Sequence, residues 1–112
     1  MERNISWVKA AKRDFEDFPD TVQIQVLRGL EIAAAGQMAD FAKPMKGLGA
    51  GVFEIRVSFH TDAYRTIYAV KLGDDVYVLH AFQKRSWTGI KTPQKEIDLI
   101  KRRLKQLKDQ LR

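Results

Sequence analysis

The chain has 112 residues, a formal net charge of +6 and no cysteine. This length suits one domain, residues 1–112, and 45% hydrophobic content is typical of a folded chain rather than a disordered one. The absence of cysteine excludes disulfides and thiolate chemistry, and two separated histidines do not favour a zinc site. No apolar run approaches the roughly 20 residues that span a bilayer and no secretory signal is present, so we expect a cytoplasmic protein.

The positive charge is unevenly distributed along the chain. Lys and Arg are outnumbered by two in residues 1–42, but exceed Asp and Glu by three in residues 43–90 and by five in residues 91–112. A positive field concentrated in the second half of a chain favours a polyanionic partner such as RNA, DNA or an acidic protein segment. Solvent-exposed charge without a partner is the simpler alternative.

The first third of the chain predicts a short strand followed by two helices. Residues 5–8 alternate in polarity, which is typical of a strand. Helical spacing begins at Ala10 and ends before Pro19, which suits the first turn of a second helix. That helix has apolar residues at helical spacing and ends at Gly36, a natural left-handed cap. These apolar residues are Val22, Val26, Leu30 and Ala33.

Residues 37–51 predict a loop, because they contain too many glycines for either periodic element. The glycines do not match a phosphate-binding or dinucleotide-binding pattern, and the segment leads into a strand rather than a helix. Lys43 and Lys46 flank the following sheet, where they could contact RNA phosphates or could remain solvated.

Three antiparallel strands follow, at residues 52–59, 63–71 and 76–84. Gly73 and Asp74 predict a two-residue hairpin that pairs Leu72 with Asp75. A loop over residues 60–63 pairs Phe59 with Tyr64. Counting in twos places these residues on one apolar face: Phe53, Ile55, Val57, Phe59, Tyr64, Tyr68, Val70, Tyr77 and Leu79. The opposite face, expected to be exposed, holds Glu54, Arg56, Ser58, Arg65, His80 and Lys84 beside Ile67, Ala69, Val76, Val78 and Phe82.

The chain ends in an amphipathic helix of nearly 20 residues. Thr92 is predicted to be its N-cap and Pro93 to lie in its first turn. A narrow apolar stripe follows, which could belong to the core or could bind a partner. The stripe consists of Ile97, Ile100, Leu104, Leu107 and Leu111.

Four segments together resemble the phage-derived HigB-like toxins of the RelE/ParE superfamily. They are KPMKGLGAGVFEIR at 43–56, AYRTIY at 63–68, HAFQKRS at 80–86 and KTP at 91–93, and the similarity covers essentially the whole chain. The resemblance implies an α+β, RelE-like fold in which an N-terminal helical hairpin packs on a twisted antiparallel sheet. It also implies the toxin of a type II toxin–antitoxin system, which cleaves mRNA on the ribosome, needs no cofactor and is held inactive by a HigA-like helix-turn-helix antitoxin.

The resemblance also implies roles for particular residues. Arg56 and Arg65 match strand arginines that serve catalysis in RelE-type ribonucleases, and Arg85 matches a basic residue after the last strand. Lys46 falls where those enzymes often have a basic loop residue. Glu54 stands where RelE has a lysine, and the RelE tyrosine beyond the last strand has no match except the nearby Trp87. The general acid and base therefore stay unassigned.

Metal-independent cleavage uses the 2′-OH of the RNA as nucleophile. Arg56 and Arg65 suit the developing phosphorane, because a guanidinium binds phosphate oxygens bidentately and stays charged. Either Lys84 or His80 could accept the proton. The simpler alternatives are a half-buried structural His80 and an ion pair between Arg56 and Glu54. Lys43, Lys46 and Lys91 are candidate RNA contacts, and loss of a partly exposed Arg65 is expected to cost less than about 1 kcal/mol.

Two other functions stay open at the level of sequence. A ParE-like toxin shares the fold but inhibits DNA gyrase and needs no hydrolytic group. A non-catalytic nucleic-acid-binding module would use the basic tail and leave no cleavage product.

Overall fold

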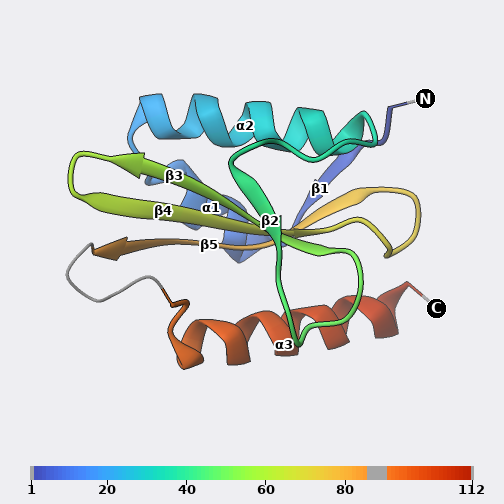
Figure 1. The fold of residues 1–112 in the computed structure, drawn as a ribbon. Helices are drawn as coiled ribbons and strands as arrows, with labels where there is room; N and C mark the ends of the chain where they lie inside the picture. The colour runs from blue at the N-terminus through green and yellow to red at the C-terminus, as the bar shows by residue number, and fades with distance from the viewer. Residues whose placement is uncertain (1, 86–90, 112) are drawn as a thin grey trace.

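The computed structural model describes residues 2–85 and 91–111 (Figure 1). Two helices, α1 (Lys9–Glu16) and α2 (Asp20–Ala34), lie on one side of a sheet, and α3 (Gln94–Gln110) lies on the other. The strands are β1 (Ile5–Trp7), β2 (Ala42–Pro44), β3 (Val52–Phe59), β4 (Asp62–Ala69) and β5 (Val76–Arg85). The α+β fold with a helical hairpin and a C-terminal helix is confirmed.

Within the described residues the sheet has the order β1-β5-β4-β3-β2. It is mixed rather than purely antiparallel, because β1 pairs in parallel with the start of β5. β2 corrects the prediction that residues 37–51 form only a loop, since its three residues pair with β3 from Phe53 to Ile55. The periodicity of a three-residue edge strand is too short to be recognised in the sequence.

The ends of the helices agree with the sequence prediction except at two positions. Gly36 has φ +89°, and the bonds from Gly36 N to Ala33 O and from Gln37 N to Ile32 O form a Schellman cap, as its position predicts. Pro19 occupies the N-cap position of α2 rather than its first turn. Pro93, not Thr92, occupies the N-cap position of α3, and no side chain caps that helix. Thr92 is therefore available for other contacts.

The strand register differs from the sequence prediction at both hairpins. Phe59 pairs with Asp62 rather than Tyr64, a shift of two residues that leaves every side chain on its predicted face and puts Arg56 opposite Arg65. The predicted β4–β5 register holds from Asp62 to Ile67, but a bulge follows and the connection extends over residues 70–75. The bulge moves Tyr77 and Leu79 to the α3 side, and Val76 and Val78 to the side of α1 and α2.

Each face of the sheet has its own core. The α1 and α2 side buries residues such as Val26, Leu30 and Ile55, and the α3 side buries Ile67, Leu79 and Ile100, among others. The second face is therefore covered in large part by α3, which corrects the prediction that it is exposed. Most of the predicted apolar stripe is core, because Ile100, Leu104 and Leu107 are buried and Ile97 packs against them. Leu111 follows the end of α3 and is exposed. Of the described residues, none forms a helix with the length and apolarity needed to cross a membrane.

Candidate active site

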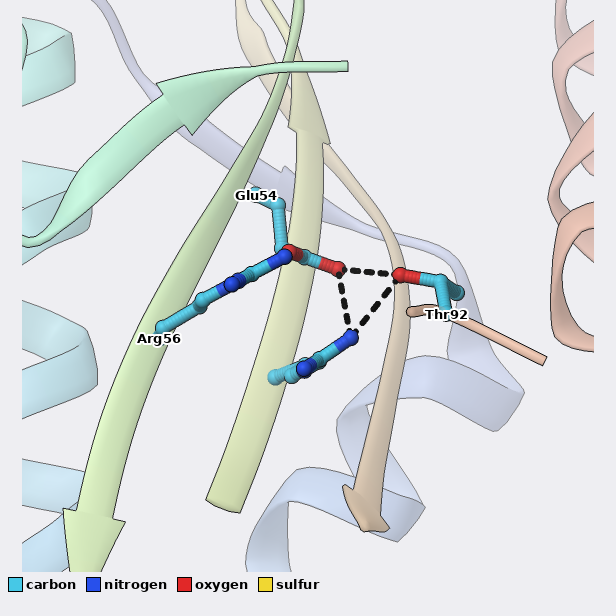
Figure 2. Close-up of polar contacts among 4 residues, drawn as sticks. Glu54, Arg56 and Thr92 are labelled. Carbon is cyan, nitrogen blue, oxygen red and sulfur yellow. Dashed lines mark hydrogen bonds and ion pairs between the residues drawn. The ribbon is translucent and has the colours of Figure 1, made fainter. Parts of the chain in front are cut away.

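Two arginines face each other across neighbouring strands on the α3 side of the sheet. Arg56 of β3 is paired with Arg65 of β4, an arrangement that ordinarily costs free energy through like-charge repulsion. Glu54 lies on the same face of β3, two residues before Arg56, and offsets this repulsion (Figure 2). Arg56 Nε donates to Glu54 Oε1 at 2.6 Å, and Arg65 Nη1 lies 3.8 Å from Oε2.

Thr92, just before α3, connects this cluster to the C-terminal helix. Its hydroxyl donates to Glu54 Oε2 at 2.9 Å and accepts a hydrogen bond from Arg65 Nη1 at 3.0 Å (Figure 2). Sequence reasoning missed this role, because Thr92 is 38 residues from Glu54 and a Thr-Pro pair is a common helix-start signal. The resemblance of residues 91–93 to the toxin family was the sequence signal that could have indicated this role.

The residues of the cluster differ in exposure. Glu54 and Arg65 are 2% and 3% exposed, whereas the Arg56 side chain is 32% exposed. Burial lowers the pKa of Arg65, the charge of Glu54 opposes this shift, and the nearby charge of Arg56 adds to it. The prediction of a partly exposed Arg65 is therefore wrong, because the start of α3 and the strand side chains enclose it. Arg56 offers the accessible guanidinium.

Lys84 brings a third cation to the same face from β5. It lies two residues beyond Phe82, the strand partner of Arg65, and is 4% exposed. Burial lowers its pKa, the charges of Arg65 and Arg56 lower it further, and Glu54 opposes them. A lysine in these surroundings has a larger neutral fraction near neutral pH than a solvated lysine, which makes it a better proton acceptor.

His80 shares this face but makes its contacts with α3. Its Nδ1 accepts a hydrogen bond from Arg103 Nη1 at 3.1 Å, and its Nε2 lies 3.0 Å from Glu96 Oε1. Because an arginine can only donate, Nδ1 is the acceptor and Nε2 carries the proton that is donated to Glu96. Burial lowers the pKa of His80; Glu96 and Asp14 oppose the shift and Arg103 adds to it. Both ring nitrogens are therefore occupied in holding β5 against α3.

The remaining predicted residues lie around the cluster. Arg85, at the end of β5, is 64% exposed and lies 3.7 Å from an Asp62 oxygen. Lys43 on β2 pairs with Glu54 and thus shares its face, while Lys46 and Lys91 are exposed. Trp87 lies outside the described residues. Among the described residues, no group of three or more His, Cys, Asp or Glu side chains is placed to hold a metal ion.

The arrangement has the groups that phosphodiester chemistry uses. An exposed guanidinium, a buried guanidinium held by a carboxylate and a hydroxyl, and a lysine with a lowered pKa converge on one face. Cationic groups fixed in advance stabilise the charge that develops on a phosphorane oxygen without further reorganisation.

Comparison with known proteins agrees with this fold. The family described as "Phage derived protein Gp49-like (DUF891)" matches residues 13–105, and no curated protein matches significantly. A free-state E. coli RelE toxin with two arginines replaced by alanine is similar in structure, with a TM-score of 0.63 and 16% identity over 91% of this chain and 98% of RelE.

A second solved structure also shares the fold. A chain of the RelBE2 toxin–antitoxin complex of Mycobacterium tuberculosis matches with a TM-score of 0.51 and 19% identity, over 76% of this chain and 99% of its own length. Sequence identities this low support a shared fold but do not assign roles to individual residues. The match to the family is stronger evidence of membership, because it spans most of the chain. The chain therefore belongs to the phage-derived Gp49-like family and has a RelE-like fold.

Proposed function

We propose that this chain is the toxin of a type II toxin–antitoxin pair, and that it cleaves mRNA on the ribosome without a metal ion and so inhibits translation. The observation that carries the proposal is the convergence of Arg56, Arg65 and Lys84 around Glu54 on a RelE-like fold. The family match to phage-derived proteins and the structural likeness to two toxin proteins support the same role.

In this proposal Arg56 binds the scissile phosphate. Its Nε is held by Glu54 and its side chain is partly exposed, so the rest of the guanidinium can reach a ligand. Arg65 is buried behind it and adds positive potential to the same position. Both arginines thereby favour the doubly charged phosphorane over the singly charged ground state, which is the difference that raises the rate.

Proton transfer is assigned to Lys84. Its neutral form takes the proton of the 2′-OH as O2′ bonds to phosphorus, and the P–O5′ bond breaks. The 5′-oxygen takes a proton from solvent water, and the hydroxide left behind takes the proton from Lys84 and restores its neutral form. Lys84 is preferred to His80 because the charges of Arg65, Arg56 and Glu54 act on it, whereas His80 contacts Glu96 and Arg103 of α3. Arg85 next to Lys84, with Lys43, Lys46 and Lys91, binds the flanking phosphates as secondary contacts.

The proposal is tested by mapping RNA ends. Purified protein, ribosomes and a defined mRNA should give products with 2′,3′-cyclic or 3′-phosphate ends, and the yield should survive excess chelator. Lys84→Ala should cleave at least 10²-fold more slowly, in the range typical of removed acid–base groups. Magnesium-dependent products with 3′-hydroxyl ends would contradict the mechanism, and growth arrest with intact transcripts would point to gyrase.

The partner is proposed to be a HigA-like helix-turn-helix antitoxin in the cytoplasm. It should present acidic or apolar groups to the cationic face, because it competes with RNA for those charges. Co-expression with the neighbouring gene should give a stable complex and restore growth. If the neighbouring product neither binds nor rescues, the toxin–antitoxin assignment loses its support.

A further inference from the structure

A second basic surface lies apart from the Arg56 cluster, where the loop before β3 meets α3. A cavity of about 170 Å³ opens there, lined by Leu48, Gly49, Val52, Lys71, Leu104 and Lys108, among others. Lys71 follows β4 and Lys108 lies near the end of α3, so two distant segments each contribute a lysine to the lining of one concavity.

The loop side of this cavity lacks side chains at two positions. Gly47 and Gly49 have φ of +83° and +88°, and a Cβ added at either would meet nothing within 4 Å. Gly51 is different, because a Cβ there would lie 2.7 Å from Lys71 Cγ. The stem of Lys71 therefore lies against the Gly51 backbone, which limits the conformational freedom of this lysine. Because Gly47 and Gly49 have no side chains, the backbone of an extended ligand could approach this loop closely.

The flank of α3 beside this loop continues the basic surface. Lys101 and Lys105 precede Lys108 by seven and three residues, a spacing that places all three on one side of a helix. All three are exposed, as are Lys46 and Lys71. Within residues 2–85 and 91–111, no carboxylate forms an ion pair with any of these five lysines. By contrast, Arg103 on the opposite flank is bound to His80.

We propose that this surface, formed by Lys46, Lys71, Lys101, Lys105 and Lys108 around the glycine loop, is a second binding site for the sugar–phosphate backbone of RNA. Ammonium groups without carboxylate partners gain most from phosphates, because no existing ion pair must be broken and bound counterions are released. A surface without base-reading groups gives affinity and orientation, not sequence preference.

The distance between this surface and the Arg56 cluster defines how long an RNA must be to contact both. Val52 lines the cavity, and Arg56 lies four residues later on the same face of β3, which corresponds to roughly 13 Å. One strand that contacts both must therefore span more than one nucleotide. This inference rests on the proposed RNA substrate, and it assigns to that substrate a length requirement that the cleavage cluster alone does not impose.

The test measures binding rather than cleavage. A 2′-O-methyl RNA of twelve nucleotides cannot be cleaved through its 2′ position, so its affinity is measured by fluorescence anisotropy between 50 and 200 mM salt. For Lys71→Gln with Lys108→Gln, the slope of log affinity against log salt should fall by about one for each lysine. The matched control, Lys9→Gln with Lys12→Gln, removes the same charge from exposed positions of α1 and should keep the wild-type slope.

Three further comparisons decide the result. A three-nucleotide oligomer should bind equally to the wild type and the Lys71/Lys108 variant, and Lys71→Arg with Lys108→Arg should restore the wild-type slope. An unchanged slope in the glutamine variant, or an equal loss in the α1 control, would overturn the inference. Wild-type binding of the oligomer without cleavage of a defined mRNA on ribosomes would reject the ribonuclease proposal alone, whereas cleavage on ribosomes without wild-type binding of the oligomer would overturn this inference alone.

Discussion

At the scale of single residues, burial separates side chains that the sequence pattern treats as equivalent. Arg56 and Arg65 are cross-strand partners of the same residue type, yet one is 32% exposed and the other 3%. Glu54 binds both, and Thr92 adds a hydroxyl between Glu54 and Arg65. Because Arg65 is buried and Arg56 is partly exposed, truncating each side chain should change the free energy of unfolding by a different amount.

Truncation of the two arginines should separate stability from activity. Arg65→Ala removes a buried partner of Glu54 and Thr92 and should lower the free energy of unfolding by about 3 kcal/mol. Arg56→Ala removes one partner of the buried Glu54 carboxylate but leaves it bound to Thr92 and near Arg65, so the free energy of unfolding should fall by about 1–2 kcal/mol while cleavage falls by about 10²–10³. Urea unfolding and single-turnover cleavage measure the two effects. Equal stability losses in both variants would contradict the difference in burial.

The same substitution at two threonines should have opposite effects on stability. Thr66 is fully buried, and its hydroxyl has no hydrogen-bond partner in the described part of the chain. Thr66→Val should therefore raise the free energy of unfolding by about 1 kcal/mol. Thr92→Val instead removes a bridging hydroxyl and should lower it by about 2 kcal/mol. Thermal unfolding checks both, and a stabilising Thr92→Val would refute the bridge.

At the scale of elements, α3 binds the sheet through apolar residues and through one group of hydrogen bonds around His80. Ile100, Leu104 and Leu107 fill the core on its side of the sheet. His80 adds hydrogen bonds to Glu96 and Arg103, and Arg103 also donates to Leu79 O at 2.9 Å. Protonation of Nδ1 would place an N–H against the guanidinium of Arg103, so this contact requires a neutral imidazole.

The pH dependence of stability should report this contact. The pKa of His80 in the folded protein is below its ordinary value of 6.5, so between the two values the unfolded chain binds more protons. Stability should therefore fall as pH decreases through about 6.5, with a slope of at most about 1.4 kcal/mol per pH unit from this group. His80→Gln should flatten the decrease between pH 7.5 and 5.5 in urea unfolding.

His60 provides the matched control for this measurement. It is exposed in the β3–β4 turn, and His60→Gln replaces a histidine while leaving the contact of His80 with Glu96 and Arg103 in place. A decrease of equal slope in His80→Gln and the wild type would show that other groups cause the acid sensitivity.

At the scale of the whole molecule, two cores share one sheet. The core under α1 and α2 and the core under α3 use opposite faces of β3, β4 and β5, so neither can lose its order without disturbing strands that the other needs. The chain should therefore unfold in one cooperative transition.

Matched cavities in the two cores test this cooperativity. Leu30→Ala on α2 and Ile100→Ala on α3 each remove a fully buried side chain and should cost about 3 kcal/mol. Both should shift the urea midpoint while leaving the m-value unchanged, with coincident transitions by circular dichroism and fluorescence. A second transition or a lower m-value in Ile100→Ala would show that α3 unfolds separately.

The sequence alone determined every helix and strand except the short β2, and it determined most faces of the sheet. Alternation in β3 and β4 and helical spacing in α2 and α3 are local, and they put Arg56, Arg65 and Lys84 on one face despite a two-residue error in the first hairpin. A shift by an even number of residues keeps the faces, which is why that error had no consequence for the cluster. The bulge after Ile67 did reverse Tyr77 and Leu79, because one extra residue changes the parity.

Only the tertiary structure decided how the cationic face is used. The sequence predicts a helix with an apolar stripe at the C-terminus but not the face of the sheet that it covers, since both faces of the sheet offer apolar area. That choice buried Arg65 and Lys84, placed Thr92 between Arg65 and Glu54, and occupied His80 with Glu96 and Arg103. Contacts between residues far apart in the chain depend on packing and register, and these have no periodic signal in the sequence.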